Sequence, residues 1–228
     1  MVGQSVDNKP TGRYDKGMTR QASSARRRLP SSVRKAAIVE AATRLFASRG
    51  YERTRMEDVA RAAGLTKGGL YFHFPDKMSL LRAVVVHHLE HYQALVLEAL
   101  RSSCPARAAI RQLVKGLVDH MRPLLESGGG LGGLQLLVEG YRHEDIRGII
   151  QEYSARFREA LEGLLARGMA EGCLRKVDPA LGAMGVTVVL KGLLLEVVVR
   201  PLEKMRLEEL AVELVEMMVG SGGEEGLA

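Results

Sequence analysis

Apolar residues recur at three- and four-residue steps along most of the chain after residue 30, which is the periodicity of amphipathic helices. In the segment 33–49 the repeating positions are Ile38, Ala41, Ala42, Leu45 and Phe46. No segment alternates between apolar and polar residues in the manner of a half-buried strand, although 186–190 and 197–199 are rich in β-branched residues. The pattern therefore predicts an all-α fold.

Glycine and proline residues divide this pattern into helices. Gly50 stops the first helix, Gly64 stops the second, and Pro75-Asp76 opens the fourth. The predicted helices cover 33–49, 54–63, a third helix capped by Thr66, a fourth that ends near 101, and further helices near 105–126, 132–141, 144–171, 178–199 and 206–219.

The segment 54–77 has the layout of a helix-turn-helix. Its first helix begins with Thr54-Arg55-Met56-Glu57, which matches a capping box in which a hydroxyl and a carboxylate satisfy free backbone N–H groups. Ala60 then places a small residue where the two helices would cross, and Gly64 occupies the turn, where positive φ is required. The second helix is expected to enter a DNA groove.

The second helix of this unit contains Gly68 and Gly69, each of which costs about 1 kcal/mol relative to alanine. Close approach of the helix backbone to DNA would account for both glycines. Lys67 and the backbone of this glycine pair are therefore candidates for base-edge contact, for example to guanine O6 and N7. The alternative is an ordinary helix pair with a solvated basic face. The apolar anchors of the helix are expected to be Leu70 and Phe74, packed on Val59 and Phe46.

Charge is distributed unevenly along the chain, whose net charge is +6. Residues 1–82 carry a balance of +10 and the remainder carries −4, which indicates a polyanion-binding module joined to a part that does not touch polyanion. Residues 1–30 are predicted to form a disordered basic tail, and 221–228 a flexible C-terminal tail. The cluster Arg26-Arg27-Arg28 could extend the DNA footprint into a minor groove, or attract DNA only weakly.

Residues 38–81 read IVEAATRLFASRGYERTRMEDVARAAGLTKGGLYFHFPDKMSLL. In this segment the chain strongly resembles the TetR/AcrR family of bacterial regulators. The resemblance implies a three-helix DNA-binding domain, here 31–76, followed by a helical effector-binding and dimerisation domain, here 77–220. It also implies DNA contacts at Thr54, Thr66, Lys67, Gly68, Tyr71, His73 and Lys77.

Three neighbouring positions complete the predicted DNA-contact set, namely Arg55, Gly69 and Phe72. Phe72 departs from the family pattern, because many members carry tyrosine or another polar residue there. A hydroxyl contact with DNA at this position is therefore not expected.

The segment 181–199 is apolar on nearly every face, but Lys191 and Glu196 interrupt it. A membrane-spanning helix needs about 20 nearly uncharged residues, so a helix buried at a protein interface is the better interpretation. The helix near 206–219 also has a broad apolar side. In the family the last two helices form the dimer interface. We therefore expect an isologous homodimer that reads a near-palindromic operator with half-sites about one helical turn, or a multiple, apart.

A ligand pocket is expected among the predicted helices between residues 77 and 171. Candidate ligand contacts are the polar, aromatic and thioether side chains on their apolar faces: His88, Tyr92, Met121, Gln135, Tyr141 and Tyr153. Each of these could instead be an ordinary core residue. Because aromatic residues make up only 4% of the chain, the pocket is predicted to take an aliphatic or amphiphilic molecule.

Other chemical signals are weak. Gly128, Gly130 and Gly133 formally match G-x-G-x-x-G, but no predicted strand precedes them, so a flexible connection between helices is predicted instead of a cofactor site. His87 and His91 lie one helical turn apart, with Glu90 between them, which suggests a metal site on a helix. Two histidines without a placed third ligand are common on helix surfaces, so no metal is predicted. No catalytic motif is recognised. Two cysteines and no secretory signal indicate a cytoplasmic protein.

The sequence thus predicts a homodimeric transcription regulator, most simply a repressor released by a small-molecule effector that changes the separation of its two DNA-reading heads. The predicted helix 77–101 joins both domains and would transmit the change. Two alternatives stay open: a helical small-molecule carrier with a vestigial DNA head, and an architectural protein that binds DNA without specificity.

Overall fold

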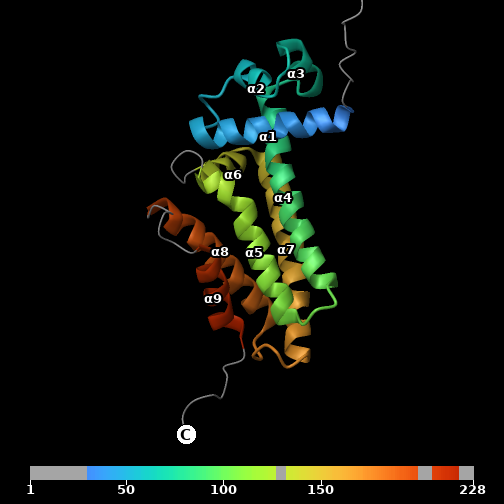
Figure 1. Ribbon diagram of the computed structural model, residues 1–228, viewed down its shortest axis with the longest axis vertical. Coiled ribbons are helices and arrows are strands. Elements are labelled where there is room, and N and C mark those ends of the chain that lie inside the picture. Colours follow the sequence, from blue (N-terminus) through green and yellow to red (C-terminus); the bar gives the residue numbers. More distant parts are fainter. Residues whose placement is uncertain (1–29, 127–131, 200–206, 221–228) are drawn as a thin grey trace, which may run out of the picture.

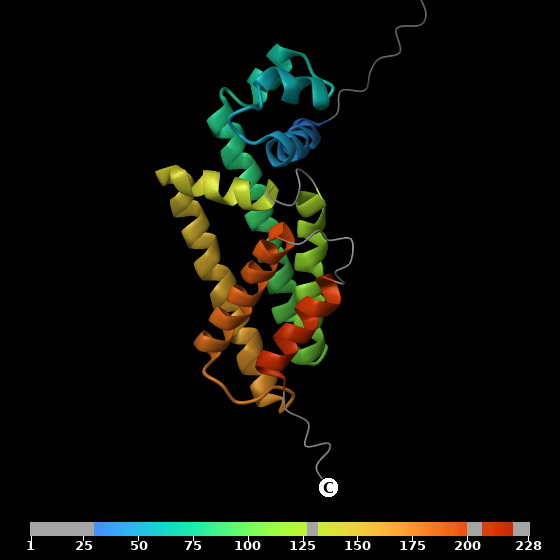
Figure 2. The same cartoon turned by 90° about the vertical axis from the view of Figure 1, so that its left-hand side faces the viewer.

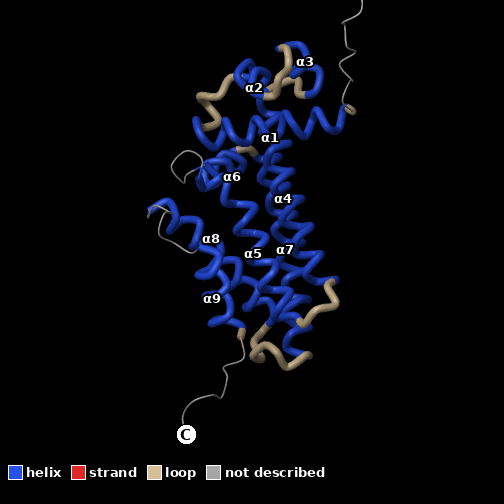
Figure 3. Tube along the Cα trace, in the orientation of Figure 1, coloured by secondary structure: helices blue, strands red, loops and turns tan. Residues whose placement is uncertain are grey.

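The computed structural model describes residues 30–126, 132–199 and 207–220. In these ranges the chain is helical, and Figure 3 shows helices and connecting loops without a strand. The helices are α1 (Ser31–Arg49), α2 (Met56–Ala62), α3 (Lys67–His73), α4 (Lys77–Arg101), α5 (Ala106–Glu126), α6 (Gly132–Arg142), α7 (Glu144–Ala170), α8 (Pro179–Val199) and α9 (Leu207–Val219). The predicted all-α fold is confirmed for the described residues.

Three predictions fall on parts of the chain that are not described. The predicted tails 1–30 and 221–228 lie outside the described residues, apart from Pro30. The predicted connection around the glycine run 128–133 also lies largely outside them.

Helices α1, α2 and α3 form a compact head at one end of the molecule (Figure 1). Its core contains the anchors expected from the sequence, and Leu70 is completely buried. The turn between α2 and α3 contains Gly64 at φ 67°, as the helix-turn-helix layout requires. The buried residues that hold the head together include Ile38, Phe46, Val59, Leu70, Phe74, Leu80 and Leu81.

The predicted capping box at the start of α2 is wrong. The N-cap residue of α2 is Arg55, which has no side-chain cap hydrogen bond. The Thr54 hydroxyl instead donates to the backbone oxygen of Gly50 at 2.8 Å. Thr54 therefore closes the turn between α1 and α2, and its hydroxyl has no role in satisfying the free N–H groups of α2.

Helix α4 is shared by the head and the body of the molecule (Figures 1 and 2). It begins with a capping box, in which an Asp76 carboxylate oxygen accepts from the Ser79 N–H at 2.6 Å. Its first turns bury Leu80 and Val84 in the core of the head. Its last turns bury Val96 and Ala99 in the second hydrophobic core, against α5, α7, α8 and α9. One continuous helix thus connects both cores.

The far end of α4 is tied to α7 by Arg167. Its Nη1 atom donates to the backbone oxygens of Leu100 and Ser102, both at 2.8 Å. The last carbonyl groups of a helix have no partner within the helix, so a guanidinium there satisfies them and favours the negative end of the helix dipole. This contact fixes the C-terminal end of α4 against the body.

Close packing at the end of α7 leads to a stability prediction. A Cβ atom on Gly168 would overlap the Leu174 side chain, with Cγ at 2.6 Å, and would lie 3.0 Å from Ala106 Cβ. We expect Gly168→Ala to lower the free energy of unfolding by about 1–3 kcal/mol, because a packed core resists added volume. Urea denaturation measures this change. Gly148→Ala is the matched control on the same helix: it meets open space and should be neutral or stabilising by up to about 1 kcal/mol.

Candidate DNA-binding surface and ligand cavity

Helix α3 is held to the head by its buried side and presents its other side to solvent. At its start the Thr66 hydroxyl accepts from the Gly69 N–H at 3.1 Å, so the predicted N-cap is confirmed. The exposed side carries Lys67, Gly68 and Tyr71, together with Phe72, which is 84% exposed.

The two glycines of α3 differ in what the fold requires of them. A Cβ atom on Gly69 would lie 3.2 Å from the Thr66 hydroxyl oxygen, so glycine there leaves room for the N-cap. A Cβ atom on Gly68 would meet nothing within 4 Å. Since alanine would favour the helix at position 68, packing inside the protein gives no reason for the glycine. Close approach of a partner would account for this glycine.

Lys67 is paired within the protein. Its ammonium lies 2.7 Å from a Glu57 carboxylate oxygen on α2. The hydrogen bond in this pair, with the charge interaction, raises the pKa of Lys67 and lowers the pKa of Glu57. Both side chains are largely solvated, so the pair is weak and exchangeable. A base or phosphate that binds Lys67 therefore competes with Glu57.

Two predicted DNA contacts are engaged in the fold itself. Thr54 is only 1% exposed, and its hydroxyl donates to backbone oxygens of Gly50 and Leu45, so in this structure the hydroxyl is engaged inside the head. Lys77 is half-buried, donates to the Glu52 backbone oxygen at 3.1 Å, and lies 4.3 Å from the centre of the Tyr51 ring.

The other predicted contacts lie around the same end of the head. Arg55 is exposed at the start of α2. His73 is half-buried at the end of α3, where its ring packs edge-on against Phe72 at 5.2 Å. All of the predicted DNA-contact residues thus belong to the head or the start of α4 at one end of the molecule (Figure 1), where Thr54 is buried.

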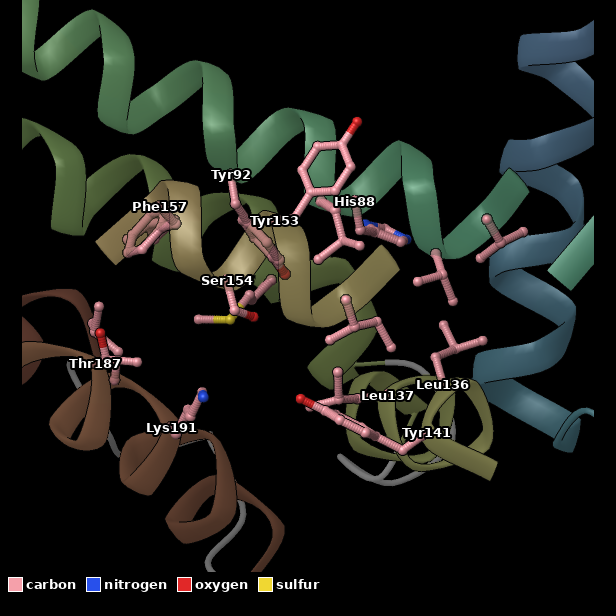
Figure 4. Close-up of a pocket in the computed structure, with 17 residues that line it drawn as sticks. His88, Tyr92, Leu136, Leu137, Tyr141, Tyr153, Ser154, Phe157, Thr187 and Lys191 are labelled. Atoms are coloured by element: carbon pink, nitrogen blue, oxygen red, sulfur yellow. The ribbon is translucent and has the colours of Figure 1, made fainter. Parts of the chain in front are cut away.

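The body contains a cavity of about 230 Å³ enclosed by residues of α4, α5, α6, α7 and α8 (Figure 4). Five of the six predicted ligand residues line it: His88, Tyr92, Met121, Tyr141 and Tyr153. The sixth, Gln135, is exposed and does not line the cavity. That prediction is wrong because this side of α6 faces the C-terminal end of α1, where the Gln135 side chain approaches Gly50.

Sequence reasoning missed three polar residues of the cavity, namely Ser154, Thr187 and Lys191. The signal in the sequence is Lys191, a positive charge that interrupts the apolar run 181–199. No helix in the described ranges has the length and apolar character that crossing a bilayer requires.

Two family models match the chain. The model for bacterial regulatory proteins of the tetR family matches residues 38–84. The model for the C-terminal part of a BetI-type transcriptional repressor matches residues 133–220. The HTH-type transcriptional regulator RutR of Escherichia coli strain K12 is 30% identical over 153 residues, which cover 65% of this chain and 68% of RutR. The protein belongs to the TetR family.

Other relatives agree with this assignment. The HTH-type transcriptional activator FasR of Mycolicibacterium smegmatis is 35% identical over 108 residues, which span 46% of this chain and 49% of FasR. The crystal structure of the TetR-family regulator PfmR from Thermus thermophilus superposes with a TM-score of 0.63 at 29% identity, covering 79% of this chain and 96% of PfmR. The chain is thus a DNA-binding transcriptional regulator with an N-terminal helix-turn-helix and a C-terminal helical domain, and it is not an enzyme.

Beside the cavity of this TetR-family protein lies a pair of histidines. His88 Nδ1 and His120 Nε2 are 2.8 Å apart, and the His91 ring stacks on His120 at 3.8 Å. Burial, with the neighbouring imidazoles, lowers the pKa of His88 to about 4 and the pKa of His120 to about 3. Both rings are therefore neutral at physiological pH. No group of three or more potential ligand residues in the described ranges could hold a metal ion.

This histidine pair makes stability depend on pH. In the unfolded chain both imidazoles take up protons below about pH 6.5, whereas in the folded chain their lowered pKa values prevent it. The free energy of unfolding should therefore be highest above pH 6.5 and fall between pH 6.5 and 4. Urea denaturation across this range should show a shallower fall for His120→Gln than for the wild type, while the α3 variant His73→Gln keeps the wild-type slope. Identical slopes for His120→Gln and the wild type would contradict the prediction.

Proposed function

We propose that this regulator is a repressor that binds a near-palindromic operator as a homodimer and releases it when a small molecule enters the cavity. One observation carries the proposal: α4 contributes to both sites. Its residues Val84, Val85, His88 and Tyr92 line the cavity, and its first turns lie in the core beneath α2 and α3. The division into a DNA-binding part, 31–76, and an effector-binding part, 77–220, is part of this proposal.

Repression is supported by the C-terminal match, because the BetI-type model that describes a repressor covers residues 133–220. FasR, whose name describes an activator, matches over only 108 residues. Since its target is chromosomal DNA in a bacterium, we place the protein in the cytoplasm.

The homodimer is supported by an apolar stripe on α8 that this chain leaves uncovered. Leu181, Met184 and Val188 follow one another at helical spacing, Leu195 lies two turns further on, and each is more than half exposed. The exposed Lys191 stands between Val188 and Leu195 at the edge of this stripe. Met217 of the neighbouring α9 is exposed as well. A stripe of this kind on two packed helices favours association with a second copy through the same surface. The proposed interface is therefore formed by α8 and α9 of both copies.

Release requires that the ligand bind one conformation of the dimer more tightly than the other. A ligand that fills the space beside Val85 and Tyr92 contacts α4 directly, so it can favour one position of this helix. The heads move with α4 because Leu80 and Leu81 are buried in their core. The proposed switch is a change in the distance between the two α3 helices of the dimer.

The test is a gel-shift assay on a binding site obtained by genomic selection with the full chain. We expect a specific over nonspecific preference above about a thousandfold, and loss of the complex when a cavity ligand is added. A preference below that value would favour the architectural protein. Ligand binding without any DNA complex would favour the carrier with a vestigial head.

A further inference from the structure

The cavity is unlike a core void, because its lining combines buried aliphatic side chains with polar groups, some of which are exposed to solvent. Val84 and Ile150 are essentially buried, and so are Leu136 and Met121. Toward solvent lie Tyr141, Ser154 and Lys191, which are exposed. The cavity is thus amphipathic, with a polar entrance and an interior that is mainly apolar but includes His88 and Tyr92.

Among the described side chains that line the cavity, Lys191 is the one that carries a charge. No carboxylate is among these lining residues, and His88 is neutral because burial lowers its pKa. Lys191 makes no ion pair with any residue that the structure describes. The charge is therefore not compensated within the described chain.

Figure 4 shows the polar ends of three side chains pointing into the same space. The ammonium of Lys191 comes from α8, the hydroxyl of Ser154 from α7 and the hydroxyl of Tyr141 from α6. All three groups can donate hydrogen bonds. Thr187 is different, because its hydroxyl already donates to the Ala183 backbone oxygen at 2.8 Å. Donors from three helices converge where an oxyanion would lie.

We propose that the cavity takes an anionic amphiphile, an aliphatic chain that ends in a carboxylate, with the carboxylate beside Lys191 and the chain against the buried aliphatic side chains. This inference rests on the proposed function, since it names the ligand class of the same cavity. A positively charged ligand is disfavoured because Lys191 repels it and no carboxylate lines the cavity to pair with it.

The aliphatic part of the lining suits a methylene chain. Val, Leu, Ile and Met side chains line the cavity beside the rings of Tyr92, Tyr153 and Phe157, and contact with methylene groups contributes about 0.8 kcal/mol per buried CH₂. The entrance position of Lys191 also matters, because a carboxylate there keeps part of its hydration and loses less solvation free energy than in the interior.

The test compares three probes with the same eight-carbon chain: octanoate, 1-octanol and octylamine in its protonated form. Calorimetry on the full chain measures the affinity of each. We expect the wild type to bind octanoate more tightly than the other two. Lys191→Gln should weaken octanoate by about tenfold and leave 1-octanol unchanged, and Lys191→Glu should reverse the preference in favour of octylamine.

The matched control is Lys176→Glu, which makes the same charge change on the exposed connection between α7 and α8, away from the cavity. It should bind octanoate like the wild type. Unchanged binding of 1-octanol by the Lys191 variants shows that they are folded and that the apolar interior is intact.

Three results would overturn the inference: octanoate affinity that does not respond to Lys191, a wild-type preference for octylamine, or no binding of any of the three probes. A gel shift with the same samples keeps this result separate from the proposed function. If another molecule releases the operator while octanoate does not bind, the carboxylate assignment fails and the ligand-released repressor stands. If octanoate binds through Lys191 without affecting DNA, the repressor fails and the ligand class stands.

Discussion

The variant Val188→Asp is expected to be monomeric and to bind the operator at least about a hundredfold more weakly than the wild type. Val188 is 63% exposed at the centre of the apolar stripe on α8. In the proposed dimer its side chain is buried against the second copy, where an unpaired carboxylate has no partner. A monomer offers only one α3 helix, so it loses the gain from engaging two half-sites at once.

Sedimentation velocity gives the oligomeric state of this variant, and a gel shift gives its operator affinity. The matched control is Val138→Asp, which introduces the same charge at a valine of α6 that is 53% exposed and lies outside the stripe. This control should remain dimeric and bind DNA normally. A Val188→Asp protein that is still dimeric would show that α8 does not form the interface.

The variant Gly68→Leu should separate DNA binding from folding. Because a Cβ atom at position 68 would meet nothing within 4 Å and the residue is exposed, we expect equal or higher thermal stability, with a gain of up to about 1 kcal/mol from better helix propensity. Operator affinity should fall at least about a hundredfold, because the leucine would occupy the space between the α3 backbone and the base pairs. Thermal denaturation and a gel shift measure the two effects.

Gly148→Leu on α7 is the control for this experiment, since position 148 also has open space around it. It should gain similar stability and keep full operator affinity. If Gly68→Leu retains sequence-selective binding at the wild-type level, the surface of α3 around Gly68 does not lie in the groove. Loss of stability in Gly68→Leu would instead show that the leucine side chain does not fit at this position in the free protein.

The helices and the helix-turn-helix could be predicted from the sequence because their signals are local. Apolar spacing, a glycine at the turn and a threonine cap each act within about one or two helical turns. The same locality explains the error at Thr54. A capping-box pattern shows that a hydroxyl and a carboxylate are correctly spaced, but not that the preceding turn at Gly50 will bind the hydroxyl first.

The cavity could be predicted only in part, because it depends on which helix faces which. His88, Tyr92 and Tyr141 lie on faces that turn toward the cavity, whereas Gln135 of the same α6 turns toward α1. Periodicity gives the apolar face of a helix but not the identity of its neighbour. Lys191 was missed for the same reason, since its position becomes meaningful only when α6, α7 and α8 surround one space.

The Arg167 contact at the far end of α4 has a mechanical consequence. A helix of 25 residues is about 37 Å long, and its C-terminal carbonyl groups are held to α7 while its other end carries the head. Any tilt of α4 then pivots near Arg167, and the arc it traces grows with distance from that pivot. A rotation of about 5° would move the start of α4 by about 3 Å, enough to lift a row of contacts out of register with DNA. The position of the Arg167 contact therefore determines how far the start of α4, and the head with it, moves for a given tilt of the helix.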